Sequence, residues 1–109
     1  MSVKFDFKSL ETGFKAVWPV NVNVPQDGGG IEVQTFDAVF LALTPEETEE
    51  AQKANDPNAW PGKFWIGLSD VEPAEFTEAL RKKFLDRAYV RQALITAYIQ
   101  FMQGIPAKN

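Results

Sequence analysis

One stretch near the carboxyl end, residues 86–104, constrains the fold more than any other part of the chain. Its apolar residues recur at the i, i+3, i+4, i+7 spacing that places side chains on one face of an α-helix. Asp86 is suited to cap the start, Gly104 is suited to the left-handed conformation that closes a helix, and Pro106 blocks continuation. The face comprises Val90, Ala93, Leu94, Ala97, Tyr98 and Phe101, and is widened by Ile95, Ile99 and Met102. So wide an apolar face must be covered, either by the rest of the chain or by a partner.

The first part of the chain predicts an antiparallel β-hairpin. Residues 18–24 alternate, with Trp18, Val20, Val22 and Val24 on one face and Asn21 and Asn23 on the other. Pro19 cannot donate to a ladder, so either this strand lies at a sheet edge or the proline sits near the start of the strand. Residues 25–30 (PQDGGG) predict a turn. Residues 31–43 then predict a second strand that runs deeper into the core, with a β-bulge near Thr35 and Phe36.

Residues 44–86 predict two helices separated by a loop. Thr44, Pro45 and Glu47 form a capping box with proline at the first helical position, so a largely exposed helix is expected to run until Asn55. Residues 55–63 read as a loop, and residues 63–68 (KFWIGL) as a short strand or a buried turn. A further helix is expected over residues 70–86. Its apolar stripe consists of Phe76, Leu80 and Phe84.

These elements predict one domain of the α+β class. Residues 1–43 are mainly β and residues 44–104 mainly α, with the hairpin or small sheet packed on about three C-terminal helices. Phe5, Phe7 and Phe14 are expected to dock onto the core. No segment approaches the roughly 20 apolar residues of a membrane span, and the N-terminus lacks a signal-peptide core. The chain is therefore expected to be soluble and intracellular.

The composition argues against catalysis. The chain has no cysteine and no histidine, which removes the commonest nucleophiles, general bases and transition-metal ligands. Its serines do not lie in a Gly-x-Ser-x-Gly elbow, and its aspartates are scattered over loops and caps. The three successive glycines lack the surroundings of a phosphate-binding loop. We expect no enzymatic activity, no bound metal and no cofactor.

Charge is distributed unevenly along the chain. The net charge is −4, and it divides into −9 over residues 1–79 and +5 over residues 80–109. The basic cluster consists of Arg81, Lys82, Lys83, Arg87 and Arg91. Such a cluster is either an ordinary solvated face or a surface that meets an acidic partner. Nucleic acid is not expected, because the acidic remainder would repel phosphate.

The order of several short motifs resembles that of the small tail assembly chaperones of long-tailed bacteriophages. The matching segments are residues 22–29 (VNVPQDGG), 35–38 (TFDA), 43–47 (LTPEE), 64–68 (FWIGL), 89–98 (YVRQALITAY) and 108–109 (KN). Each motif alone is weak, and their shared order carries the resemblance. The segment between Leu68 and Phe76 departs from the expected pattern, and residues 1–16 match nothing specific.

The resemblance implies a non-catalytic role in virion assembly. Such chaperones bind the long tape measure protein in the host cytoplasm, keep it soluble, help to recruit the tail tube protein and are absent from the mature virion. We hypothesise that the partner-binding surface includes Phe64, Trp65, Arg87, Arg91, Leu94, Tyr98 and Phe101. A structural tail or head–tail component retained in the virion, and a small regulatory module that binds another protein, are the alternatives.

Overall fold

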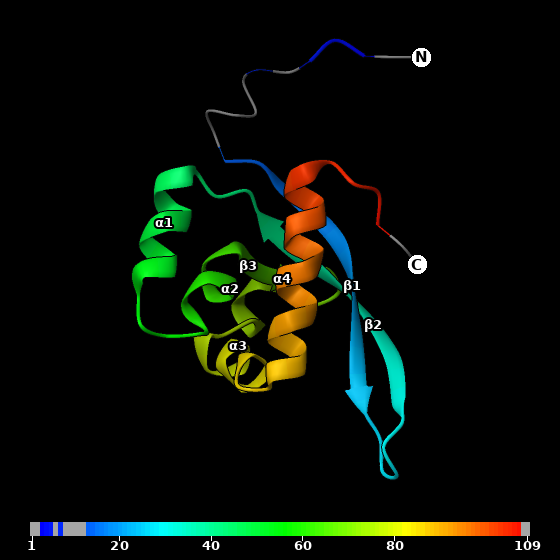
Figure 1. Ribbon diagram of the computed structural model, residues 1–109. Coiled ribbons are helices and arrows are strands. Elements are labelled where there is room, and N and C mark those ends of the chain that lie inside the picture. Colours follow the sequence, from blue (N-terminus) through cyan, green and yellow to red (C-terminus); the bar gives the residue numbers. More distant parts are fainter. Residues whose placement is uncertain (1–2, 6, 8–12, 108–109) are drawn as a thin grey trace.

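The computed structural model describes residues 3–5, 7 and 13–107 and has a three-stranded sheet beside helices (Figure 1). The strands are antiparallel and lie in the order β1-β2-β3. The elements are β1 (Lys15–Pro25), β2 (Ile31–Leu41), α1 (Pro45–Lys53), α2 (Ala59–Phe64), β3 (Trp65–Leu68), the 3₁₀ turn η2 (Pro73–Glu75), α3 (Glu78–Leu85) and α4 (Ala88–Gln103). The predicted α+β class is confirmed.

The hairpin β1–β2 follows the predicted alternation. Val20 and Val22 are buried, whereas Asn21 and Asn23 are exposed. The strand β1 lies at the sheet edge, the first of the two alternatives that its proline left open. In the connecting turn Gly28 has a φ of 91°, a left-handed conformation that costs glycine little.

The central strand β2 is paired unevenly on its two sides. It pairs with β1 along its whole length, but with β3 only over residues 38–40. The irregularity lies between Val39 and Phe40, on the β3 side, because Gly67 and Trp65 pair with these residues and leave Ile66 between them. The bulge predicted near Thr35 and Phe36 is therefore wrong. Among the described residues, the stretch 31–36 has a neighbouring strand on one side only.

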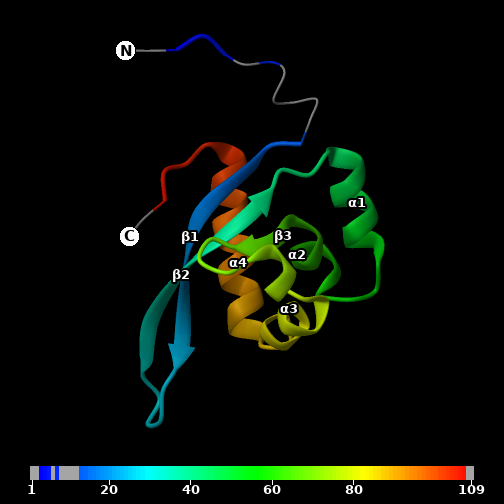
Figure 2. The ribbon, with the colours of Figure 1, turned by 180° about the vertical axis from the view of Figure 1, so that it is seen from behind.

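The end of the hairpin extends beyond the helical body. We call residues 22–36 the hairpin arm; Figures 1 and 2 show its tip projecting past α3 and the start of α4. Across the inner face of the arm lie α3 and the first turns of α4. Side chains of the arm therefore lie opposite side chains of α3 and α4, which come from a distant part of the sequence.

Helix α4 packs across β1 and buries most of its predicted face. Val90, Leu94, Ala97 and Tyr98 are buried, whereas Ile99 and Met102 are 41% and 47% exposed. The first lane of the face (Leu94, Tyr98 and Phe101) thus belongs to the core or its border, whereas Ile99 and Met102 of the second lane (Ile95, Ile99 and Met102) lie near solvent. At the end, Gly104 adopts the predicted left-handed conformation, with φ 71°.

The predicted start of this helix is wrong. Helix α4 begins at Ala88 with Arg87 at its N-cap, and Asp86 ends α3 instead. The Asp86 carboxylate accepts hydrogen bonds from Lys82 Nζ and Asn58 Nδ2, both at 2.9 Å. These two bonds, that from Lys82 first, lower the pKa of Asp86 below its usual value. The carboxylate is engaged by α3 and by the residue before α2, which leaves it unavailable as a cap for α4.

The helix predicted over residues 70–86 is divided in two. After η2 the chain breaks at Phe76, and α3 begins again with Thr77, whose hydroxyl accepts a hydrogen bond from the Leu80 N–H at 3.1 Å. The break changes which side chains face inward. Phe76 and Leu85 are buried, and Phe84, expected to be inward, is 42% exposed.

Three other expectations had different outcomes. The capping box at Thr44 and the exposed helix α1 are confirmed. The loop predicted over residues 55–63 is wrong, because α2 starts within it; Pro61 lies in the first turn, where a missing N–H costs no helical bond.

Phe5 and Phe7 are 60% and 70% exposed rather than docked, and Phe14 is 48% exposed while stacking on Phe101.

Candidate partner-binding surface

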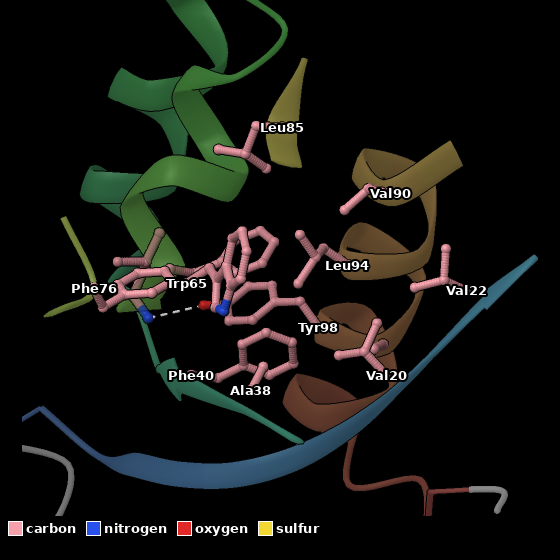
Figure 3. Close-up of a cluster of buried hydrophobic side chains, with 13 residues drawn as sticks. Val20, Val22, Ala38, Phe40, Trp65, Phe76, Leu85, Val90, Leu94 and Tyr98 are labelled. Atoms are coloured by element: carbon pink, nitrogen blue, oxygen red, sulfur yellow. Dashed lines mark hydrogen bonds between the residues drawn. The ribbon is translucent and has the colours of Figure 1, made fainter. Parts of the chain in front are cut away.

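Four of the seven predicted site residues lie in the core. Phe64, Trp65, Leu94 and Tyr98 are each at most 2% exposed. The rings of Phe64 and Tyr98 stack with centroids 3.8 Å apart, and Phe40 meets both edge-on. Figure 3 shows Leu94 and Tyr98 pointing from α4 toward Phe40 and Trp65. These four side chains stabilise the fold and present no surface to a partner, which corrects the hypothesis for them.

The polar atoms of this aromatic cluster are satisfied internally. The Tyr98 hydroxyl accepts a hydrogen bond from the Leu43 N–H at 2.9 Å, and Trp65 Nε1 donates to the Gly67 carbonyl at 2.9 Å. Burial raises the pKa of the Tyr98 hydroxyl, and the bond from Leu43 partly opposes that shift. Both groups therefore have a structural explanation that requires no ligand.

The two predicted arginines have different environments. Arg91 is half-buried, and its Nη1 donates to the Leu85 carbonyl at 2.7 Å and to Asn58 Oδ1 at 3.4 Å. It therefore fastens α4 to the end of α3 and to the start of α2. Arg87 is exposed at the beginning of α4. Of these two predicted site residues, Arg87 is exposed, whereas Arg91 is half-buried and bonded within the fold.

Phe101 lies at the border of the core. Its ring is partly buried and meets Trp18 edge-on at 5.4 Å. Beyond it, the end of α4 exposes Ile99, Met102 and Ile105, each between 41% and 47%. We call these three residues the C-terminal patch. Phe101 itself packs on the core and is not among these exposed residues.

A surface groove with mainly apolar walls lies between the hairpin arm and the junction of α3 and α4. This arm groove has a volume of about 530 Å³. Its apolar walls include Val22, Val24, Phe36, Leu80 and Phe84. It adjoins an apolar pocket of about 150 Å³ between Phe36, Trp65, Leu68 and Phe84. The two spaces share Phe36 and Phe84, so together they form one apolar depression.

Cationic side chains border this depression. Lys83 and Arg87 line the arm groove, and none of its lining residues is acidic. The ion pairs found in the described part of the chain are Lys53–Glu49 and Lys82–Asp86, so neither Lys83 nor Arg87 is neutralised by such a pair. In a chain with a net charge of −4, this depression is locally positive.

The sequence pattern pointed to Phe84 on the helical wall of this groove, but as a core residue and not as part of a surface. Phe84 was assigned to the core because its spacing from Phe76 and Leu80 fits a continuous helix. The signal that was missed is Thr77, a good N-cap residue directly before Glu78, which indicates a new helix start. The other wall is formed by the arm, and its position opposite α3 depends on how the sheet packs.

Comparison of the chain with the profiles of known protein families, with curated protein sequences and with solved structures found no match. Within residues 3–5, 7 and 13–107, no helix is long and apolar enough to cross a membrane. The same residues contain no cluster of three or more acidic, histidine or cysteine side chains suited to a metal ion. Lys108 and Asn109, the last motif of the resemblance, lie outside the described residues.

Proposed function

We propose that the protein is a non-catalytic assembly chaperone of a long-tailed bacteriophage. It binds the tape measure protein in the host cytoplasm, keeps it soluble while the tail tube protein assembles, and is absent from the mature virion. The phage assignment rests on the order of the motifs between residues 22 and 98. The binding role rests on one structural observation: a chain with a well-packed core still exposes large apolar side chains in and around a depression.

The chemistry of the exposed surface supports a protein partner. Phe84 in the arm groove and Ile99 and Met102 in the C-terminal patch are each more than 40% exposed. An aggregation-prone chain is kept soluble when its apolar side chains are covered by such surfaces. The proposal requires neither a metal nor a cofactor.

Co-expression tests this proposal directly. A fragment of the tape measure protein, encoded near this gene, should be insoluble alone, and should become soluble and co-purify when the full chain is present. An insoluble fragment, or a soluble fragment without a complex, overturns the proposal. The position of the gene gives an independent check, because a chaperone gene is expected just upstream of a very long helical reading frame.

A structural component of the tail is the second candidate. The observation that favours it is the partly unpaired strand β2, since residues 31–36 offer a free edge to another subunit among the described residues. Mass spectrometry of purified virions separates the two candidates. A chaperone should be missing from the particle, whereas a tail component should be present in stoichiometric amount.

A further inference from the structure

We propose that the arm groove is the docking site for an amphipathic helix whose apolar stripe is flanked by acidic side chains; resting on the proposed function, this helix belongs to the tape measure protein. The inference starts from the groove's apolar walls. Phe84 is 42% exposed and Phe36 is half-buried, although both border a depression and lie near the buried Trp65. The groove beside these rings has a volume of about 530 Å³, much larger than the water-sized voids that protein interiors leave. It therefore has room for side chains of another molecule.

The charge around the groove identifies the flanks of the partner. Lys83 and Arg87 stand on its helical wall, and among the described residues no carboxylate lines it. Since residues 1–79 carry a charge of −9, a randomly placed surface of this chain would more often be acidic. A positive rim around an apolar floor attracts glutamate and aspartate and disfavours a basic partner.

The backbone of the walls indicates the conformation of the partner. The strand β1 pairs with β2 along one side, and the helices α3 and α4 use their main-chain groups within each helix except at the ends, so the groove walls are mainly side chains. A segment lying in an apolar groove has to satisfy its own N–H and C=O groups, and a helix does so internally. Strand addition at the free edge of β2 would cover Val33 but would give no role to Phe84 and Arg87.

Within the described residues, a second copy of this chain does not supply such a helix. The acidic helix of the chain is α1, which carries Glu46, Glu47, Glu49 and Glu50, yet Ala51 is its one buried residue. It lacks an apolar stripe that would fill the groove. The other long helix, α4, has its main apolar lane in the core.

Matched variants of the full chain test the docking site by capture of the tape measure fragment. Phe84→Ser removes the apolar anchor, and Lys83→Glu with Arg87→Glu reverses the rim. Val17→Ser is the control for the first, because Val17 is an exposed apolar residue (54%) that does not line the groove, and Lys53→Glu with Lys63→Glu is the control for the second, because it changes the net charge equally. Circular dichroism and melting temperature establish that each variant is folded.

The groove variants should bind the fragment roughly tenfold or more weakly, and the controls within about threefold of the unaltered chain. If the unaltered chain and all variants capture the fragment equally, the groove assignment is overturned and the proposed function stands. If the unaltered chain captures nothing, the proposed function fails, and the groove is then judged with a probe that is independent of it.

That probe is a helix-forming peptide of about 20 residues with a leucine stripe flanked by glutamate, compared with the same peptide flanked by lysine. In a titration followed by nuclear magnetic resonance, the glutamate peptide should shift the amide signals of Phe36, Phe84 and Arg87 and should gain helicity. Equal binding of the two peptides, shifts confined to the C-terminal patch, or an extended bound peptide would overturn the inference. So would self-association of the unliganded chain that shifts the same groove signals.

Discussion

The hydroxyl of Tyr98 accepts a hydrogen bond from the backbone N–H of Leu43, 55 residues earlier in the chain, at 2.9 Å. The bond joins α4 to the segment between β2 and α1. It also fixes the Tyr98 ring where it stacks on Phe64. Tyr98 thereby ties the segment after the hairpin, through its hydroxyl, and the short helix α2, through its ring, to the C-terminal helix.

Replacing Tyr98 should show how much its hydrogen bond to Leu43 contributes to the free energy of unfolding. In Tyr98→Phe the buried Leu43 N–H loses its acceptor while the ring stack remains, so the free energy of unfolding should fall by about 1–3 kcal/mol. Denaturant unfolding measures the change. Tyr89→Phe is the control, because Tyr89 is only half-buried, and its effect should be small. Equal effects of the two substitutions would show that the Leu43 bond contributes little.

The same hydroxyl should make stability depend on alkaline pH. Burial raises the pKa of Tyr98 above the ordinary value of 10.0, so the folded chain retains this proton at pH values where the unfolded chain releases it. The contribution is fully present below pH 10 and is lost as the pH rises from 10 through the folded-state pKa. Unfolding measured between neutral pH and pH 11 should show a decline that is shallower in Tyr98→Phe. Parallel curves for the two proteins would contradict the assignment.

The two lanes of α4 should differ in their sensitivity to truncation. Leu94 is fully buried, so Leu94→Ala should cost about 2–5 kcal/mol through lost burial and the cavity left behind. Ile99 is 41% exposed, and Ile99→Ala should cost less than about 1.5 kcal/mol. Chemical denaturation of the two variants provides the comparison. A larger loss for Ile99 would place the second lane in the core.

Replacement of Trp65 and of Trp60 should lower stability to different extents, because their indole N–H groups differ in hydrogen bonding. Trp65→Phe removes the hydrogen bond from Nε1 to the Gly67 carbonyl, at a cost of about 0.5–1.5 kcal/mol beyond any change in packing. The Nε1 of Trp60 is buried without a hydrogen-bond partner, so Trp60→Phe removes an unsatisfied donor and should cost less. Thermal melts of the two variants give the order. The reverse order would mean that the Trp60 indole has an acceptor in solution.

Substitutions of Arg87, at the N-cap of α4, and of Arg91, within α4, should differ in their effect on the free energy of unfolding. Arg91→Met loses the bonds to Leu85 and Asn58 and should lower the free energy of unfolding by about 1–2 kcal/mol. Arg87→Met should leave it nearly unchanged, because this side chain is exposed at the start of α4. Unfolding curves test both. A stability loss at Arg87 as large as that at Arg91 would contradict this distinction.

Local patterns predicted much of the fold. The alternation around Val20 and Val22 indicated which face of β1 is buried, and Pro19 was compatible with its place at the edge. Thr44 and Gly104 each marked a helix end through the geometry of its own residue. These features depend on neighbours in the sequence, so they could be recognised without tertiary information.

The candidate site was less predictable, because it depends on packing between distant segments. Aromatic residues such as Phe64 and Tyr98 were assigned to a partner surface, yet each supplies the other with a stacking neighbour across the fold. Conversely, Phe84 was assigned to the core, and the helix break before it turned the ring outward. Whether an apolar residue faces a partner or the interior is decided by the register of its element and by what packs opposite.

The partly unpaired strand β2 has a consequence for how the protein behaves at high concentration. Residues 31–36 present backbone donors and acceptors along a free edge, and Ile31 and Val33 beside them are 63% and 60% exposed. Such an edge can pair with a strand of another copy and so lead to aggregation. Within residues 31–36, Glu32 is the one charged residue that opposes this pairing. A protein proposed to keep another chain soluble thus has a vulnerability of its own, and its solubility should depend on how well that single charge keeps copies apart.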